Sequence, residues 1–354
     1  MKLDVTAEIK EKYSIKVSLN TIQVDALFKF YMDAGFLYPD KLRQLTPYMD
    51  IIKNNWSALI DSKESLLFVL TAAHSYSKKF ASITLWKNGT YSIFSQHLVS
   101  NGNPRLSLLL ILESIRTIQW DADNSCFRST QNWFRLSNKY ARRVFATSHK
   151  ILGKEHSSLI RFQYLTLPLT QIQKTTSNLF KIEKISKASK TLNGFISKQL
   201  NPVFIKAEEL DINDILFTKL KDKYVRCNLQ RRRCILKITD AKTNKIIGCI
   251  IANRAPLGLN FSLLENRAYY IIDRDLDKIN LEIIVKEINW QLQSFYQDFE
   301  NQSIPIVTNK KTATTLLDNG ASFIREYAQL VWLKEGRVEL QNYFHSLLRG
   351  ITKS

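Results

Sequence analysis

Apolar residues recur along the first half of the chain with two periods, one helical and one strand-like. Near-helical spacing predicts helices at 19–32 and 41–59, and the almost wholly apolar run at 105–120 predicts a buried helix. A further helix is expected at 133–144. Alternating or continuous apolar segments predict strands at 65–74, 80–85, 91–99, 126–130 and 159–167.

A tight turn is predicted between two of these strands. Asn88 and Gly89 stand between the apolar segments 80–85 and 91–99, and both residue types readily adopt the positive φ that a two-residue hairpin turn needs. We therefore expect these two strands to form an antiparallel hairpin.

The second half of the chain repeats this order of elements. Helices are expected at 207–224, 279–300, 310–317 and 338–348, and strands at 234–239, 246–253, 269–272, 303–308 and 323–333. Each half thus has a helix, a strand, a hairpin, a long buried helix, a short strand, a short helix and a last strand. A chain of 354 residues also exceeds the roughly 250–300 residues of a single core. We expect an N-terminal domain at 1–170, a basic linker or exposed helix at 171–200, and a C-terminal domain at 201–354.

This order of elements resembles the GNAT acyltransferase fold, most closely at 233–334, where NGASFIREYAQLVWLKEG is similar to that fold's final short helix and paired strands. The resemblance implies an α/β (α+β) fold of two tandem GNAT-like domains. Each would be a mixed, mostly antiparallel sheet flanked by helices, with an additional C-terminal helix in the second domain. GNAT enzymes bind acyl-coenzyme A through a Gly-rich turn at the N-terminus of the central helix, where free N–H groups hold the pyrophosphate.

The sequence departs from that phosphate-binding pattern in both halves. In the second half the helix at 279–300 is preceded by Asp273, Asp275 and Asp277, with no glycine, and carboxylates there repel phosphate. In the first half the segment 100–105 has one glycine, one arginine and a proline that removes an N–H group. We therefore expect no coenzyme A cofactor.

Charge is the most unusual bulk property of the chain. The 51 Lys and Arg residues exceed the 32 Asp and Glu residues, which gives a formal charge of +19 and favours anionic ligands or partners, although lysine-rich chains are often simply well solvated. Four cysteines and five histidines lack the spacing of a metal site. No apolar run approaches the ~20 residues of a membrane helix, so we expect a cytoplasmic protein without a membrane or metal partner.

The densest basic segment spans 226–274, with ten Lys and Arg residues against three acids. Arginine can bind phosphate or the O6/N7 edge of guanine with two hydrogen bonds, tyrosine can stack on a base, and a carboxylate can accept from guanine N1 and N2. The predicted ligand-binding residues in this segment are Arg231, Arg232, Arg233, Arg254, Arg267, Tyr269 and Asp273. The alternative is a solvated basic strand edge that prevents pairing between sheets.

A second basic set could line a ligand cleft or a dimer surface, or could be a solvated helix face. It comprises Arg105, Arg128, Arg135, Arg142 and Arg143 together with Trp133, and we assign Arg105, Arg128 and Trp133 to ligand binding. Candidates for acid–base catalysis are few: His97, Glu326 and Tyr327 have suitable side chains. We expect structural roles for these three, and no catalytic residue.

The segments FYMDAGFLYPDKL and WKNGTYSIFSQHLVSNG, with the degenerate tandem GNAT-like pattern and the positive charge, resemble the cyanobacterial cyclic di-GMP receptor family. This resemblance implies a non-catalytic receptor. Such a receptor would bind cyclic di-GMP at the interface of a homodimer and pass the signal to a transcriptional regulator.

Two other functions stay open from the sequence. One is an active GNAT N-acyltransferase that uses acetyl-coenzyme A. The other is direct binding of nucleic acid, which rests on charge alone, since no helix-turn-helix or zinc motif is present.

Overall fold

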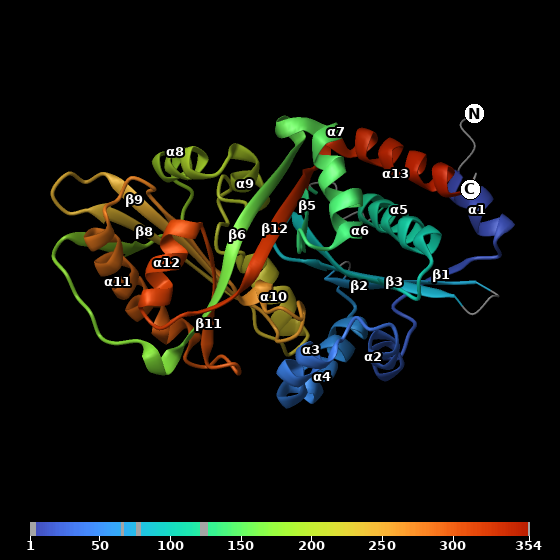
Figure 1. Ribbon diagram of the computed structural model, residues 1–354, viewed down its shortest axis with the longest axis horizontal. Helices are drawn as coiled ribbons and strands as arrows, with labels where there is room; N and C mark the ends of the chain where they lie inside the picture. Colours follow the sequence, from blue (N-terminus) through green and yellow to red (C-terminus); the bar gives the residue numbers. More distant parts are fainter. Residues whose placement is uncertain (1–4, 65–66, 76–78, 121–126, 353–354) are drawn as a thin grey trace.

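The strands of the chain lie side by side in one continuous mixed sheet (Figure 1). The computed structural model describes residues 5–64, 67–75, 79–120 and 127–352. Within these ranges twelve strands follow the order β1-β2-β3-β4-β5-β12-β6-β11-β10-β9-β8-β7. Their bounds are β1 Lys16–Leu19, β2 Phe68–His74, β3 Phe80–Lys87, β4 Ser92–Ser100, β5 Ser129–Phe134, β6 Ser157–Pro168, β7 Phe180–Lys184, β8 Arg232–Asp240, β9 Ile246–Arg254, β10 Ala268–Ile272, β11 Ser303–Thr308 and β12 Ser322–Leu333.

The sheet is a tandem repeat with exchanged last strands. In each half four strands pair antiparallel and the fourth pairs parallel with the fifth, which gives β4 beside β5 and β10 beside β11. The last strand of the first half, β6, then pairs with β11, and the last strand of the second half, β12, pairs with β5. Strands β6 and β12 also pair with each other at the centre of the sheet. The predicted tandem α/β fold is confirmed, and the exchange joins its halves.

Helices cover both faces of this sheet. In the first half α5 packs on one face of β2 and β3, with α13 against α5, and α2 to α4 lie on the other face (Figure 1). In the second half α8 packs against β9 and β10, and α11 and α12 pack against β11 and β6. The α-helices are α1 Val5–Lys12, α2 Val24–Asp33, α3 Pro39–Leu45, α4 Met49–Ile60, α5 Pro104–Trp120, α6 Lys139–Ala141, α7 Thr147–His156, α8 Lys190–Gln199, α9 Pro202–Ala207, α10 Thr218–Arg226, α11 Lys278–Tyr296, α12 Lys310–Asp318 and α13 Arg337–Thr352.

Strand β5 corrects two sequence predictions. It runs from Ser129 to Phe134, so the strand expected at 126–130 is displaced, and Trp133 and Phe134 are in a strand instead of a helix. Residue 126 itself lies outside the described ranges. The polar segment of β5 is buried because its side chains bond within the interior: Gln131 Nε2 donates to the Ala207 carbonyl at 2.8 Å. Apolar periodicity cannot detect a buried strand of this composition.

The connection between the halves also differs from the expected pattern. The helix predicted at 207–224 is wrong over its first part: α9 ends at Ala207, residues 208–217 are not helical, and only α10, from Thr218, falls in the predicted range. The segment 171–200 contains the edge strand β7 and the helix α8. The proposed domain boundaries remain a prediction. Within the described part of the chain, no helix is both long and apolar enough to cross a membrane.

Candidate functional site

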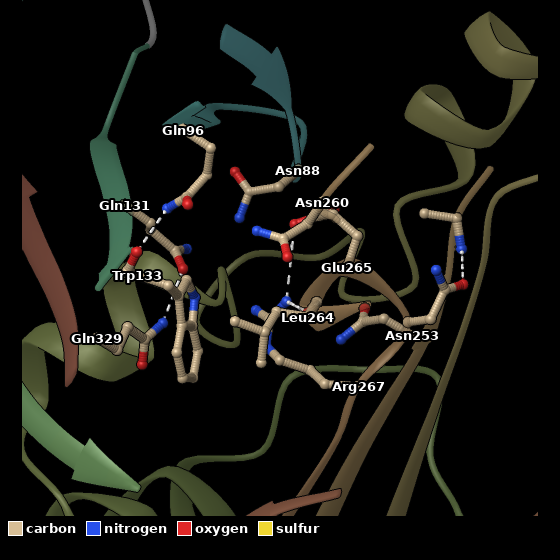
Figure 2. Close-up of polar contacts among 12 residues, drawn as sticks. Asn88, Gln96, Gln131, Trp133, Asn253, Asn260, Leu264, Glu265, Arg267 and Gln329 are labelled. Atoms are coloured by element: carbon tan, nitrogen blue, oxygen red, sulfur yellow. Dashed lines mark hydrogen bonds and ion pairs between the residues drawn. The ribbon is translucent and has the colours of Figure 1, made fainter. Parts of the chain in front are cut away.

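The basic segment singled out in the sequence forms an interior ion-pair network. The side chains of Arg231, Arg233 and Arg267 are 5%, 1% and 2% exposed. Arg231 pairs with Glu265 at 3.1 Å, and Glu208 pairs with Arg233 at 3.2 Å and with Arg267 at 3.0 Å. Figure 2 shows Glu265 and Arg267, which both belong to the segment between β9 and β10. These guanidinium groups compensate buried carboxylates instead of facing an open surface.

The other predicted ligand-binding residues are dispersed over the molecule. Tyr269 is fully buried beside Arg267. Asp298 forms ion pairs with both Arg232 and Arg254, and Asp273 pairs with Lys245. Arg128 pairs with Asp211, and the guanidinium of Arg105 lies over the Tyr13 ring. Trp133 is the one of the ten that lines a cavity of more than 400 Å³. The ten residues therefore do not form a single site, and their ligand-binding role stays a prediction.

A cavity of about 430 Å³ lies where β4 and β5 separate, and we call it the splay cavity. Residues Ser92–Phe94 of β4 pair in parallel with Ser129–Gln131 of β5, and beyond these residues the two strands diverge. Gln96 Nε2 spans the gap and donates to the Trp133 carbonyl at 3.2 Å, as Figure 2 shows. The lining residues come from both halves of the chain and include Phe36, Tyr38, His97, Asn132, Asn260 and Phe261.

A bulge in β4 places His97 at this cavity. Its φ is +54°, a left-handed conformation that non-glycine residues rarely adopt, and the strand register shifts beside it. Thr84 Oγ1 lies 2.8 Å from His97 Nδ1 and donates to the Gln96 carbonyl at 3.1 Å. Both contacts are satisfied when His97 Nδ1 carries the hydrogen, which leaves Nε2 as an acceptor.

The His97 ring is neutral and its Nε2 has no hydrogen-bond partner among the described residues. Burial, with a contribution from the charge of Lys41, lowers the pKa of His97 to about 3. The ring stacks on Phe261 with centroids 4.3 Å apart. The indole Nε1 of Trp133, a residue 4% exposed, likewise lacks a partner within the described ranges. Behind the cavity wall, one acceptor and one donor are therefore buried without a partner among the described residues, and leaving such groups unpaired is costly.

Lys41 and Arg135 line the splay cavity, and Arg325 lies beside them; we call these three cations the basic cluster. The hydroxyl of Tyr38 accepts hydrogen bonds from both Arg135 and Arg325. Among the described residues none of the three cations has a carboxylate partner, in contrast to the buried arginines above. Burial of the amine, together with the charge of Arg325, lowers the pKa of Lys41 to about 7. Unpaired cations that destabilise one another favour an anionic ligand.

The ammonium of Lys41 also belongs to a short polar chain. Lys41 Nζ donates to Ser262 Oγ at 2.6 Å, and Tyr327 Oη donates to the same oxygen at 2.8 Å. We call Lys41, Ser262 and Tyr327 the waist, because on its far side lies a second cavity of about 360 Å³, the side cavity. Sequence analysis identified His97, Trp133, Arg135 and Tyr327 but missed Tyr38, Lys41, Ser262 and Arg325, which come from separate segments and carry no motif.

The corresponding place in the second half is closed. Between β10 and β11 the cavity has a volume of about 50 Å³. The first-turn amide of Asn280 in α11 donates to Asp277 Oδ1 at 2.9 Å, and in α5 the amide of Arg105 donates to Asn103 Oδ1 at 3.0 Å. At each helix end a side chain of the chain thus occupies one of the amides that could otherwise bind a phosphate. No group of three or more metal-ligating side chains occurs in the described segments.

Comparison with known proteins gives similar structures but no family. No protein-family profile matches the chain, and no curated protein sequence matches it. A tandem GNAT protein from the clavulanic acid biosynthesis pathway is similar with 7% identity, over 90% of this chain and 98% of that chain, with a TM-score of 0.37. A putative acetyltransferase from Pyrococcus horikoshii is similar with 9% identity, over 90% and 89% of the two chains, with a TM-score of 0.42. At these values the similarities assign no activity to this chain.

Proposed function

We propose that this protein is a non-catalytic receptor for an anionic guanine nucleotide, with cyclic di-GMP as the ligand, and that the ligand binds in the splay cavity. The observation that carries the proposal is the basic cluster: three cations that face a cavity and lack carboxylate partners within the described residues. Phosphate groups supply the missing negative charge, and arginine binds them with two parallel hydrogen bonds.

The rest of the wall has the chemistry that a guanine base needs. The half-buried ring of Phe36 can contact a base, and the amides of Asn132 and Asn260 can donate and accept at base edges. A volume of about 430 Å³ also lies within the usual 300–1,000 Å³ range of small-molecule sites.

An N-acyltransferase is the second candidate, and one observation favours it. The splay cavity brings together His97 and Tyr327, two residue types that can act as base and acid, and burial raises the pKa of Tyr327. The capped ends of α5 and α11 disfavour the acyl-coenzyme A that such an enzyme would use. The homodimer and the transcriptional regulator as partner follow from the family resemblance alone, and the cytoplasmic location follows from the apolar pattern of the sequence; all three stay predictions.

Calorimetric titration of the purified chain with cyclic di-GMP, GTP and acetyl-coenzyme A in parallel tests this proposal. We expect sub-micromolar binding of cyclic di-GMP, at least tenfold weaker binding in Arg135→Gln and Arg325→Gln, and no turnover. Arg142→Gln is the matched control, because Arg142 is an exposed arginine near the splay cavity that does not line it. Binding of acetyl-coenzyme A with thiol release, and none of the nucleotide, would replace the receptor with the enzyme.

A further inference from the structure

The splay cavity and the side cavity are two chambers that share a wall. Both are lined by Lys41, Phe261, Ser262 and Tyr327. Their volumes are about 430 Å³ and 360 Å³, so the two cavities are of similar size. The hydrogen bonds of Ser262 with Lys41 and Tyr327 cross the boundary between them.

Each chamber has its own ring-binding and amide groups. The splay cavity has Phe36, Trp133 and Asn132, as described above. The side cavity is lined by Tyr48 and Tyr164 and by the amides of Gln44 and Asn301. Both chambers thus have aromatic rings and side-chain amides in their walls, and this arrangement suits a ligand with two similar aromatic ends.

The positive charge lies between the chambers. Lys41 faces both, Arg135 lines the splay cavity, and Arg325 lines the side cavity. The two guanidinium groups approach each other closely enough to share the Tyr38 hydroxyl. A ligand that fits this distribution carries its negative charge in the middle and its aromatic rings at the ends. A mononucleotide carries phosphate at one end only and fills one chamber.

On the basis of the proposed function, we infer that a single chain binds one whole dinucleotide, with one base in each chamber and the phosphates against the basic cluster at the waist. The phosphate replaces Ser262 as the partner of the Lys41 ammonium, and Ser262 remains bonded to Tyr327. No second copy of the chain is needed to complete the site, in contrast to the dimer-interface site that the family resemblance implies.

The test fills one chamber at a time. Ser137 lines the splay cavity and Thr166 lines the side cavity, and neither is fully buried, so Ser137→Trp and Thr166→Trp add bulk without replacing core residues. Gln44→Trp, on the exposed face of α3 at the side cavity, is a second filling variant if Thr166→Trp does not fold. Binding of cyclic di-GMP, its linear dinucleotide and GMP is measured by calorimetry, with thermal melting to verify folding and light scattering to count chains.

We expect one cyclic di-GMP per monomeric chain, and at least tenfold weaker binding when either chamber is filled. Filling the side cavity should weaken cyclic di-GMP binding at least tenfold more than GMP binding. One ligand per two chains, or unchanged affinity in both side-cavity variants, would overturn the two-chamber site while leaving the receptor intact. If the unmodified chain binds none of the three nucleotides, the proposed function fails as well, and that result is seen before any variant is made.

Discussion

At the scale of single residues, the environment of Lys41 decides how the basic cluster responds to pH. Burial of its amine, together with the charge of Arg325, lowers its pKa to about 7. A bound phosphate stabilises the ammonium and raises that pKa, so binding takes up a proton above about pH 7. Nucleotide affinity should therefore fall as pH rises from about 7 to 9.

Substitutions at Lys41 test this linkage. We expect the affinity of the wild-type chain to fall roughly tenfold between about pH 7 and pH 8.5, because one proton is linked to binding. Lys41→Met should bind weakly at all pH values, and Lys41→Arg should bind without this pH dependence because its charge is permanent. Calorimetry at three pH values measures both. An unchanged slope in Lys41→Arg would contradict the assignment.

Burial of His97 should make the free energy of unfolding decrease at acid pH. Burial lowers its pKa from 6.5 to about 3, so between these values the unfolded chain binds a proton that the folded chain does not. The free energy of unfolding therefore keeps its full value above about pH 6.5 and decreases as the pH falls toward 3, because protonation of His97 stabilises the unfolded chain. At about pH 4 the loss should be about 3 kcal/mol.

His97→Asn is the matched variant, because asparagine tolerates the left-handed backbone at this position. Urea unfolding at about pH 7 and pH 4 should show a smaller acid destabilisation in the variant than in the wild-type chain. Equal losses in the two proteins would mean that His97 is protonated in the folded state.

At the scale of elements, the loop after β9 is held against α4 by contacts that only glycine permits. Trp56 Nε1 donates to the Gly258 carbonyl at 2.9 Å, and Asn55 donates to the Leu257 carbonyl at 2.9 Å. Gly258 has a φ of +87°, and a Cβ atom there would overlap the side chain of Ile52. This contact joins a helix of the first half to the loop that carries Phe261 and Ser262.

Gly258→Ala should therefore destabilise the chain by about 2–4 kcal/mol, through backbone strain and overpacking together. Gly35→Ala is the control, because Gly35 has a similar φ of +69° and nothing within 4 Å of an added Cβ. It should cost only about 1 kcal/mol. The two free energies of unfolding, from urea titrations, separate overlap from strain, and equal values would rule out the close contact.

Sequence periodicity predicted most elements, but not the way in which they associate. The apolar runs of β9 and α11 are local signals, and each corresponds to the observed element. The hairpin of β3 and β4 is also confirmed, but four residues join its strands and neither Asn88 nor Gly89 has a positive φ, so the predicted two-residue turn is wrong. The polar strand β5 was missed because its burial depends on partners such as Ala207. The site was missed in part because Lys41 and Ser262 lie in separate segments, and the contact between them depends on how the two halves pack.

At the scale of the whole molecule, the exchange of β6 and β12 makes the two halves interdependent. Strand β6 belongs to the first half in sequence, yet it lies between β11 and β12, which both come from the second half. A fragment of residues 1–172 would leave β6 without either neighbour and β5 without β12. An unpaired buried strand exposes backbone groups and apolar side chains, so such a fragment should not fold alone.

We expect fragments 1–172 and 173–354 to be insoluble or unfolded when expressed separately, and to form a soluble one-to-one complex when expressed together. The break falls in an exposed connection between β6 and β7, so it removes no strand. An intact chain with a short Gly-Ser insertion after residue 172 is the control, and it should melt as the wild-type chain does because long surface loops cost little. A cooperative thermal transition of either fragment alone would show that the halves are independent domains.

If only the complex folds, the exchanged strands hold the splay cavity together, since Trp133 reaches it from β5 and Tyr327 from β12.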